Sequence, residues 1–181
     1  REVPVIAVVG YTNAGKSTLL NTLTGSEVLV EDKLFATLDT RSRQLHLPSG
    51  RQAVLTDTVG FIRDLPKDLF AAFKATFEEA QDADLLIHVI DGSDPAHREH
   101  VEATEALLVK LGLERMPRIT LLNKMDLLEP RHAEAIGRAD PDAIPVTATD
   151  RATLDPLLER IDAMLGEHGE VRDEQELSAA Q

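Results

Sequence analysis

The residues with the clearest chemical purpose lie near the N-terminus, directly after an apolar run. They fit the pattern G-x-x-x-x-G-K-[ST], extended by one residue, and are Gly10, Tyr11, Thr12, Asn13, Ala14, Gly15, Lys16, Ser17 and Thr18. The glycines allow backbone angles that turn N–H groups inward, where they hold phosphate oxygens at the start of a helix. Lys16 brings positive charge to the β- and γ-phosphates, and the Ser17 hydroxyl is a hard oxygen ligand for Mg²⁺. The pattern predicts a phosphate-binding loop (P-loop), and the alternative is a tight strand–helix turn without a ligand.

A D-x-x-G pattern follows a later apolar run and comprises Asp57, Thr58, Val59 and Gly60. The Asp57 carboxylate is expected to reach Mg²⁺ through water, and the Gly60 N–H is expected to bond the γ-phosphate. A D-x-x-G pattern alone is weak evidence for a phosphate site. Its position after a P-loop, at the end of a strand, is what favours these roles in Mg²⁺ and γ-phosphate binding.

Two further groups are typical of a site that reads a nucleotide base. The first comprises Asn123, Lys124, Met125 and Asp126, and the second comprises Thr147, Ala148 and Thr149. A carboxylate at Asp126 matches the paired donors N1–H and N2–H₂ of guanine, whereas adenine presents an acceptor there. We expect Lys124 to pack over the base, Asn123 to tie this loop to the P-loop, and the Ala148 N–H to donate to guanine O6.

The long segment 26–41 has no clear period, and long ordered loops are usually functional. It contains Phe35, Ala36, Thr37, Leu38 and Asp39, which we assign to the nucleotide site. Thr37 is the better candidate for a second protein ligand to Mg²⁺, and Thr40 competes for this role. A γ-phosphate would order the segment, and its loss would release it.

Strands and helices alternate along the chain in a way that places these motifs together. We expect strands at 3–9, 43–47, 52–56, 85–90, 119–122 and 144–147. Helices are expected at 17–23, 67–81, 94–111, 130–138 and 154–165. This order predicts an α/β fold with an open, six-stranded, mostly parallel sheet, one antiparallel hairpin strand, and helices on both faces. Ligands of such sheets bind at the carboxyl ends of the strands, where every motif above falls.

The composition bounds the remaining possibilities. The 181 residues suffice for one domain, which we place at 1–166, and the acidic segment 167–181 has little to bury. For that tail we predict disorder, with a continuation of the last helix as the alternative. The net charge of -13 argues against non-specific nucleic-acid binding and against an anionic membrane surface. We expect no membrane span, and the absence of cysteine excludes disulfides and cysteine-bound zinc. The start at Arg1, close to a strand, suggests an excised domain.

Three long runs resemble HflX, a ribosome-associated GTPase of the Obg–HflX group of translation-factor-related GTPases. They are GYTNAGKSTL from Gly10, LVEDKLFATLD from Leu29 and LTDTVGFIRDLP from Leu55, and the resemblance covers about residues 4 to 165. The chain departs from the family pattern at Thr40, often proline, and at Thr147, usually serine. Both positions still leave the hydroxyl and backbone N–H that the site needs.

The resemblance implies a Ras-like P-loop NTPase domain that binds GTP and GDP with Mg²⁺ and hydrolyses GTP. It also implies action on the large ribosomal subunit, including splitting of stalled ribosomes, by a cytoplasmic protein. We expect a monomer, with peripheral membrane association as a further possibility. The family's N-terminal domain and helical linker are absent here, and we expect most ribosomal RNA contacts to fall to them.

The expected catalytic residues are Lys16, Thr37, Gly60 and Asn13. Ras-like enzymes place glutamine after D-x-x-G to orient water, whereas this chain has Phe61, so we predict slow intrinsic hydrolysis that a partner stimulates. Arg63 lies nearby, and a solvated position is its simpler interpretation. Asn13 either helps to hold K⁺ beside the phosphates, as in some similar GTPases, or merely stabilises the loop.

Three alternatives to this function remain. A nucleotide-gated binding module with negligible turnover fits Phe61. An Obg-like or tRNA-modifying GTPase fits the nucleotide motifs, but residues 26–64 argue against it. Asp126 disfavours ATP, although the resemblance leaves some ATP use open.

The phenylalanines and one pair of histidines also carry predictions. Of the five phenylalanines, we expect Phe35 or Phe61 to be mobile or exposed, whereas Phe70, Phe73 and Phe77 would form the core face of one helix. His97 and His100 have the spacing of metal ligands on a helix. No third ligand is evident, so we predict an exposed face for this pair.

Overall fold

The computed structural model describes residues 3–11, 13–25, 41–57 and 81–179. The helix expected at 67–81 and the loop expected at 26–41 lie almost wholly outside these residues. So do all five phenylalanines, and the predictions for them are not tested.

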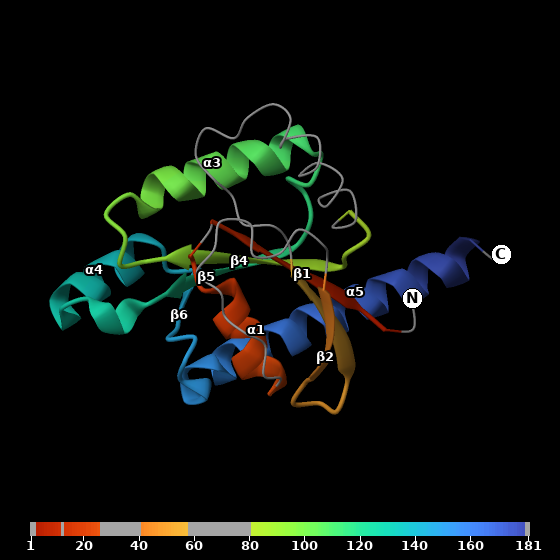
Figure 1. Ribbon diagram of the computed structural model, residues 1–181. Helices are drawn as coiled ribbons and strands as arrows, with labels where there is room; N and C mark the ends of the chain where they lie inside the picture. The colour runs from red at the N-terminus through yellow and green to blue at the C-terminus, as the bar shows by residue number, and fades with distance from the viewer. Residues whose placement is uncertain (1–2, 12, 26–40, 58–80, 180–181) are drawn as a thin grey trace.

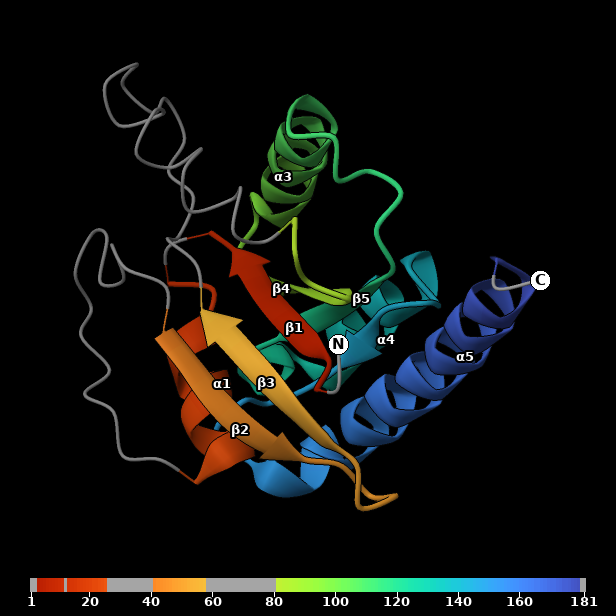
Figure 2. The same cartoon turned by 90° about the vertical axis from the view of Figure 1, so that its right-hand side faces the viewer.

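Six strands form one sheet in the described part of the chain (Figures 1 and 2). They are β1 (Val5–Gly10), β2 (Arg41–His46), β3 (Gln52–Asp57), β4 (Leu85–Asp91), β5 (Arg118–Asn123) and β6 (Ile144–Pro145). In the order β2-β3-β1-β4-β5-β6, every neighbouring pair is parallel except the hairpin pair β2 and β3. The predicted open, mostly parallel sheet with one antiparallel strand is therefore confirmed.

Helices cover both faces of the sheet (Figure 1). They are α1 (Lys16–Thr24), α3 (His97–Lys110), α4 (Pro130–Ala139) and α5 (Asp155–Ala179), with short 3₁₀ turns η1 (Met125–Leu127) and η2 (Arg151–Leu154). Alternate residues of β1 serve the two faces, as strand geometry requires. Ile6 and Val8 pack with α1 and α5, whereas Ala7 and Val9 pack beneath α3.

Two element boundaries differ from the sequence prediction. The last strand has only two residues because Pro145 lacks an N–H for the ladder and β6 is an edge strand, although the Val146 N–H still donates to the Leu122 carbonyl at 2.8 Å. The helix expected from Asp94 begins at His97 instead. The Asp94 carboxylate accepts a hydrogen bond from the Ala96 N–H at 2.9 Å and so stabilises a turn ahead of α3.

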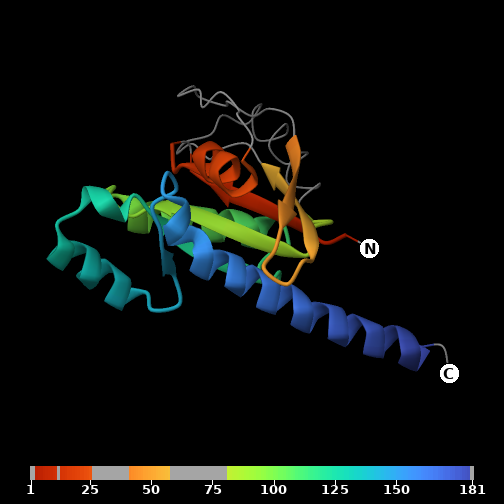
Figure 3. The ribbon, with the colours of Figure 1, turned by 90° about the horizontal axis from the view of Figure 1, so that it is seen from below.

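The prediction of a disordered tail is wrong, and the helical alternative describes it. Helix α5 continues without a break to Ala179. Its second half extends beyond the sheet, as Figure 3 shows. The segment 167–179 contains four glutamates, which are good helix formers, and no proline, so its sequence is compatible with continuation of the helix. Near the end, Leu177 is 69% exposed.

Candidate nucleotide site

The P-loop connects β1 to α1 at the carboxyl end of the sheet. Two of its glycines have no room for a side chain: a Cβ on Gly10 would meet the Val89 carbonyl, and one on Gly15 would meet the Asn123 amide. Gly15 also has a φ of 104° and precedes the first residue of α1. The sequence pattern therefore has a steric cause here, since β4 and the base-reading loop approach the backbone closely.

Lys16 is buried, with 8% of its surface exposed. Its ammonium donates to the carbonyls of Gly10 at 3.3 Å and Tyr11 at 3.4 Å, so the side chain lies along the inside of its own loop. Burial lowers the pKa of Lys16, and the nearby Asp57 carboxylate opposes this by raising it. A polyphosphate would favour the charged form in the same way.

The donor set expected for Mg²⁺ fits what the structure describes of it. Asp57 ends β3 and is 5% exposed, and Ser17 lies half-buried in the first turn of α1. A carboxylate and a hydroxyl are the hard oxygen ligands that Mg²⁺ prefers. The third predicted ligand, Thr37, lies outside the described residues.

The base-reading loop is attached to the P-loop at two points. The buried Asn123 side chain donates from Nδ2 to the Ala14 carbonyl and accepts the Ala148 N–H at Oδ1, both at 2.9 Å. The Lys124 ammonium donates to the Asn13 carbonyl at 2.7 Å and pairs with Asp91 at 3.3 Å. The structure thus gives Asn123 the connecting contact that the sequence led us to expect. It also joins the Thr147–Thr149 segment to the same side chain.

Asp126 remains available for a base. It is exposed, and the Thr147 hydroxyl donates to its Oδ1 at 3.3 Å. Lys124 has a left-handed φ of 63°, which is uncommon for a residue other than glycine and turns the chain sharply into η1. The strained turn carries the Lys124 stem back toward the P-loop while Asp126 faces solvent.

Several predicted site residues fall outside the described part of the chain. These are Thr12, Phe35, Ala36, Thr37, Leu38, Asp39, Thr58, Val59 and Gly60, together with Phe61 and Arg63. Their roles stay predictions. The remaining site residues lie where β1, β3, β5 and β6 end.

The prediction of an exposed histidine pair is wrong. Both imidazoles are half-buried. His100 stacks on Tyr11 of the P-loop with ring centroids 3.9 Å apart and an interplanar angle of 17°. His97 Nδ1 lies 2.9 Å from the Asp94 carbonyl oxygen, which can only accept a hydrogen bond from it. Among the described residues no group of three His, Cys, Asp or Glu side chains could hold a metal ion. No sequence signal pointed to the stack because its two residues lie on separate elements.

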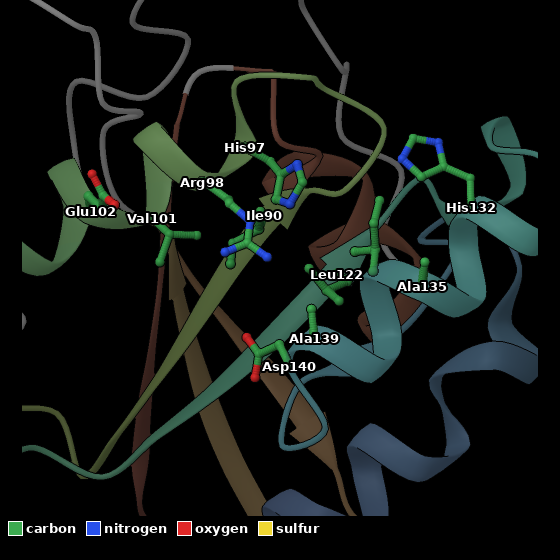
Figure 4. A pocket seen from close by; sticks show the side chains of 11 residues that line it. Ile90, His97, Arg98, Val101, Glu102, Leu122, His132, Ala135, Ala139 and Asp140 are labelled. Atoms are coloured by element: carbon green, nitrogen blue, oxygen red, sulfur yellow. The ribbon is translucent and has the colours of Figure 1, made fainter.

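A cleft of about 470 Å³ lies apart from the nucleotide motifs, between α3 and α4 (Figure 4). Ile90 and Leu122 come from the strands beneath it, Arg98 comes from α3, and Asp140 follows α4. A second, smaller cavity of about 140 Å³ lies between the P-loop and the start of α3 and is lined by Tyr11, Asn13, His88, Asp91, Asp94 and His100. The first turns of α3 therefore have open space on two sides.

With this geometry in place, comparison with known proteins decides the family. Residues 5–124 match the 50S ribosome-binding GTPase family. The chain belongs to that family. The match spans the P-loop, β3 and the start of the base-reading motif, so the motifs predicted from the sequence are those of a GTPase domain.

Individual relatives show which members of this family the chain is similar to in sequence. The chain is 52% identical over 170 residues to "GTPase HflX" of Caldanaerobacter subterraneus subsp. tengcongensis, covering 94% of this chain and 39% of the relative. It is 48% identical over 128 residues to "GTPase HflX" of Escherichia coli, covering 71% of this chain and 30% of the relative. The chain thus spans well under half the length of these relatives. The predicted HflX resemblance, confined to the GTPase domain, is confirmed.

A solved structure supports the same fold. The GTP-binding protein from the hyperthermophilic archaeon Sulfolobus solfataricus, in complex with GDP, is 30% identical to this chain with a TM-score of 0.71. The alignment covers 91% of this chain and 53% of that one. The predicted Ras-like P-loop fold is therefore confirmed. As for membranes, no helix in the described ranges is long and apolar enough to cross a bilayer.

Proposed function

We infer that this chain is the nucleotide switch domain of an HflX-like GTPase. It binds GTP with Mg²⁺, hydrolyses GTP to GDP, and in the GTP state associates with the large ribosomal subunit. The observation that carries this proposal is the double attachment of the base-reading loop to the P-loop, through Asn123 at Ala14 and Lys124 at Asn13. A guanine at one motif and a triphosphate at the other would then belong to one ligand.

The chain's own residues would act by positioning and charge. Backbone N–H groups of residues 13–18 would hold the phosphates, and Lys16 would move from the Gly10 and Tyr11 carbonyls to phosphate oxygens. Ser17 and Asp57, with the predicted Thr37, would hold Mg²⁺, which would neutralise charge on the β- and γ-phosphates. Gly60 would bond the γ-phosphate and Asp126 would read guanine. The Ala148 N–H, which donates to Asn123 Oδ1 in this structure, would have to turn toward guanine O6 or share its hydrogen with it.

Hydrolysis by the isolated domain should be slow because Phe61 cannot orient water by hydrogen bonding. A partner would complete the site. Asn13 offers a second way to stabilise charge on the phosphates, through a bound K⁺. It is exposed, has a φ of 66° and has its carbonyl fixed by Lys124. If its side chain helps to hold K⁺, GTP turnover should be faster in KCl than in NaCl at matched ionic strength. Equal rates in the two salts would leave Asn13 with a loop-stabilising role.

The ribosome is the proposed partner, and the description of the matching family, 50S ribosome-binding GTPase, supports it. The net charge of -13 disfavours broad contact between this domain and ribosomal RNA. We therefore propose a limited contact face here, with most RNA contacts made by other parts of the longer protein, and splitting of stalled ribosomes as the outcome. The proposed state is a cytoplasmic monomer, with peripheral membrane association as a further possibility.

The deciding experiment is GTP hydrolysis with and without large ribosomal subunits, using the longest available form of the protein. Strong stimulation is expected. Tight GDP binding with no stimulation would favour the alternative that Phe61 suggests, a nucleotide-gated binding module. No binding of guanine nucleotides would overturn the proposal.

Base recognition is tested by Asp126→Asn. An amide presents an acceptor and a donor, which match N1–H and the C2 carbonyl of xanthine but not the two donors of guanine. We expect GDP affinity to fall about 100-fold, because a charged bidentate contact is lost, and xanthosine diphosphate affinity to rise. Asp142→Asn, at an exposed carboxylate outside the motif, is the matched control. Unchanged nucleotide preference in Asp126→Asn would show that another group reads the base.

A further inference from the structure

Tyr11 differs from the rest of the P-loop in where its side chain goes. The ring packs against the apolar cluster beneath α3 formed by Ala7, Val9, Leu86, Leu108, Leu111 and Leu113. It also stacks on His100 of α3 at a centroid distance of 3.9 Å. The P-loop is therefore attached to a helix that lies outside the nucleotide motifs.

The backbone of the same residue supports the lysine. The Tyr11 carbonyl accepts the Ala14 N–H at 3.1 Å and the Lys16 ammonium at 3.4 Å. A shift of Tyr11 would displace both the loop closure and the rest position of the ammonium. The side chain and the carbonyl of Tyr11 thus link His100 to Lys16.

The other attachments of the loop act at different atoms. Asn123 holds Ala14 and Lys124 holds Asn13, and both come from the base-reading motif. These contacts fix the half of the loop that faces the base. The stack on His100 fixes the opposite half, where the loop leaves β1.

His100 lies in the first turns of α3, where the described part of the chain leaves no residue of that helix fully buried. The fully buried residues of α3, Thr104 and Leu108, both lie in its later turns. Its first turns lie beside the cavities of about 140 and 470 Å³, and such voids remove packing contacts. The Asp94 carboxylate lies 3.9 Å from His100 Nδ1 and also accepts the Ala96 N–H, which ties the ring to the start of the helix.

We propose that His100 is a positioning residue for the P-loop: its stack on Tyr11 sets the Tyr11 carbonyl and thereby the approach of Lys16 to the phosphates. The inference rests on the proposed GTPase function. It assigns α3 a part in phosphate binding that the nucleotide motifs do not contain. Because the base is read at the other half of the loop, His100 should influence turnover of the triphosphate and leave guanine selectivity unchanged.

The test compares single-turnover GTP hydrolysis and GDP binding for wild type, His100→Ala, His100→Phe and His97→Ala. We expect His100→Ala to lower the hydrolysis rate about 2- to 10-fold, the range of one aromatic pair, with the preference for GDP over inosine diphosphate unchanged. His100→Phe retains a stacking ring and should restore the rate. His97→Ala removes a neighbouring imidazole whose ring nitrogen contacts the Asp94 carbonyl, and this variant should match wild type.

A double-mutant comparison guards against a general folding defect. Tyr11→Leu and His100→Leu keep apolar volume but lose the aromatic pair, and the double variant should lose no more than either single one. Additive losses, a wild-type rate in His100→Ala, or failure of His100→Phe to restore the rate would each overturn the inference. If wild type hydrolyses no GTP, the proposed function fails. If wild type hydrolyses GTP and His100→Ala hydrolyses it at the same rate, the proposed function stands without this role for His100.

Discussion

The two faces of the sheet are packed in different ways. On one face, α1 and α5 share a single continuous cluster of buried side chains with the strands. On the other face, α3 and α4 cover two smaller clusters, and α4 has no buried residue. Both cavities described above also lie on this second face.

This difference suggests that the α1–α5 face supplies most of the stability, whereas the α3–α4 face can move more easily. The α1–α5 face fixes the first turn of α1, on which Lys16 and Ser17 depend. Among the residues that the structure describes, the α3–α4 face has fewer buried side chains, so we expect its helices to move at a smaller cost in free energy. The P-loop lies between the two, with its lysine on the rigid side and its tyrosine on the loose side.

The largest expected effect is a core truncation on the rigid face. Leu157 of α5 is fully buried in the continuous cluster, so Leu157→Ala should lower the free energy of unfolding by about 2–5 kcal/mol. Urea denaturation followed by circular dichroism measures this. A loss below 1 kcal/mol would show that α5 collapses onto the cavity and is not rigidly packed.

Acid should weaken the loose face. Burial, and next the positive charge of Arg118, lower the pKa of His88 to about 4 from 6.5. The unfolded chain therefore takes up a proton below pH 6.5 while the folded protein does not until about pH 4. Stability should be fully present above pH 6.5 and fall between these values, by at most about 3 kcal/mol.

His88→Gln tests this assignment. Denaturation midpoints at pH 7 and pH 5 should differ less in the variant than in wild type, because the buried titrating group is gone. His46→Gln, at an exposed residue of β2, provides the control. An unchanged pH dependence in His88→Gln would assign the acid sensitivity to other groups.

A smaller effect is expected where the hairpin tip meets α5. The Asp162 carboxylate accepts the Ser49 N–H at 2.8 Å and the Ser49 hydroxyl at 2.7 Å, and its side chain is 13% exposed. Asp162→Ala should cost about 1 kcal/mol, because water can replace the carboxylate at the surface donors. Glu159→Ala, at an exposed residue of the same helix, should be near neutral in the same denaturation assay.

The smallest effect should come from the loose face itself. Ile136 of α4 is half-buried beside the large cleft, so Ile136→Ala should cost roughly 1 kcal/mol or less, far below the loss in Leu157→Ala. Paired denaturation curves give this ratio directly. Equal losses in the two variants would mean that the faces are packed alike.

Much of the fold was predictable because its signals are local. Apolar runs predicted the strands, and Gly25, with a φ of 67°, ends α1 where the sequence indicated. The start of α3 was harder to predict, because an Asp-Pro pair suits either a helix start or a turn. The tail was misjudged because low burial was weighed above helix propensity.

The sequence by itself determined the nucleotide chemistry, because phosphate loops and base-reading carboxylates depend on residue type at short, regular spacing. It also determined the parallel part of the sheet, because β1, β4 and β5 are runs of mainly apolar residues that are buried on both faces. Only the tertiary structure decided that Asn123 also holds the segment after β6, through the Ala148 N–H, and that Tyr11 stacks on His100. These contacts depend on how β1, β4, β5 and α3 lie side by side, and no spacing along the chain encodes that arrangement.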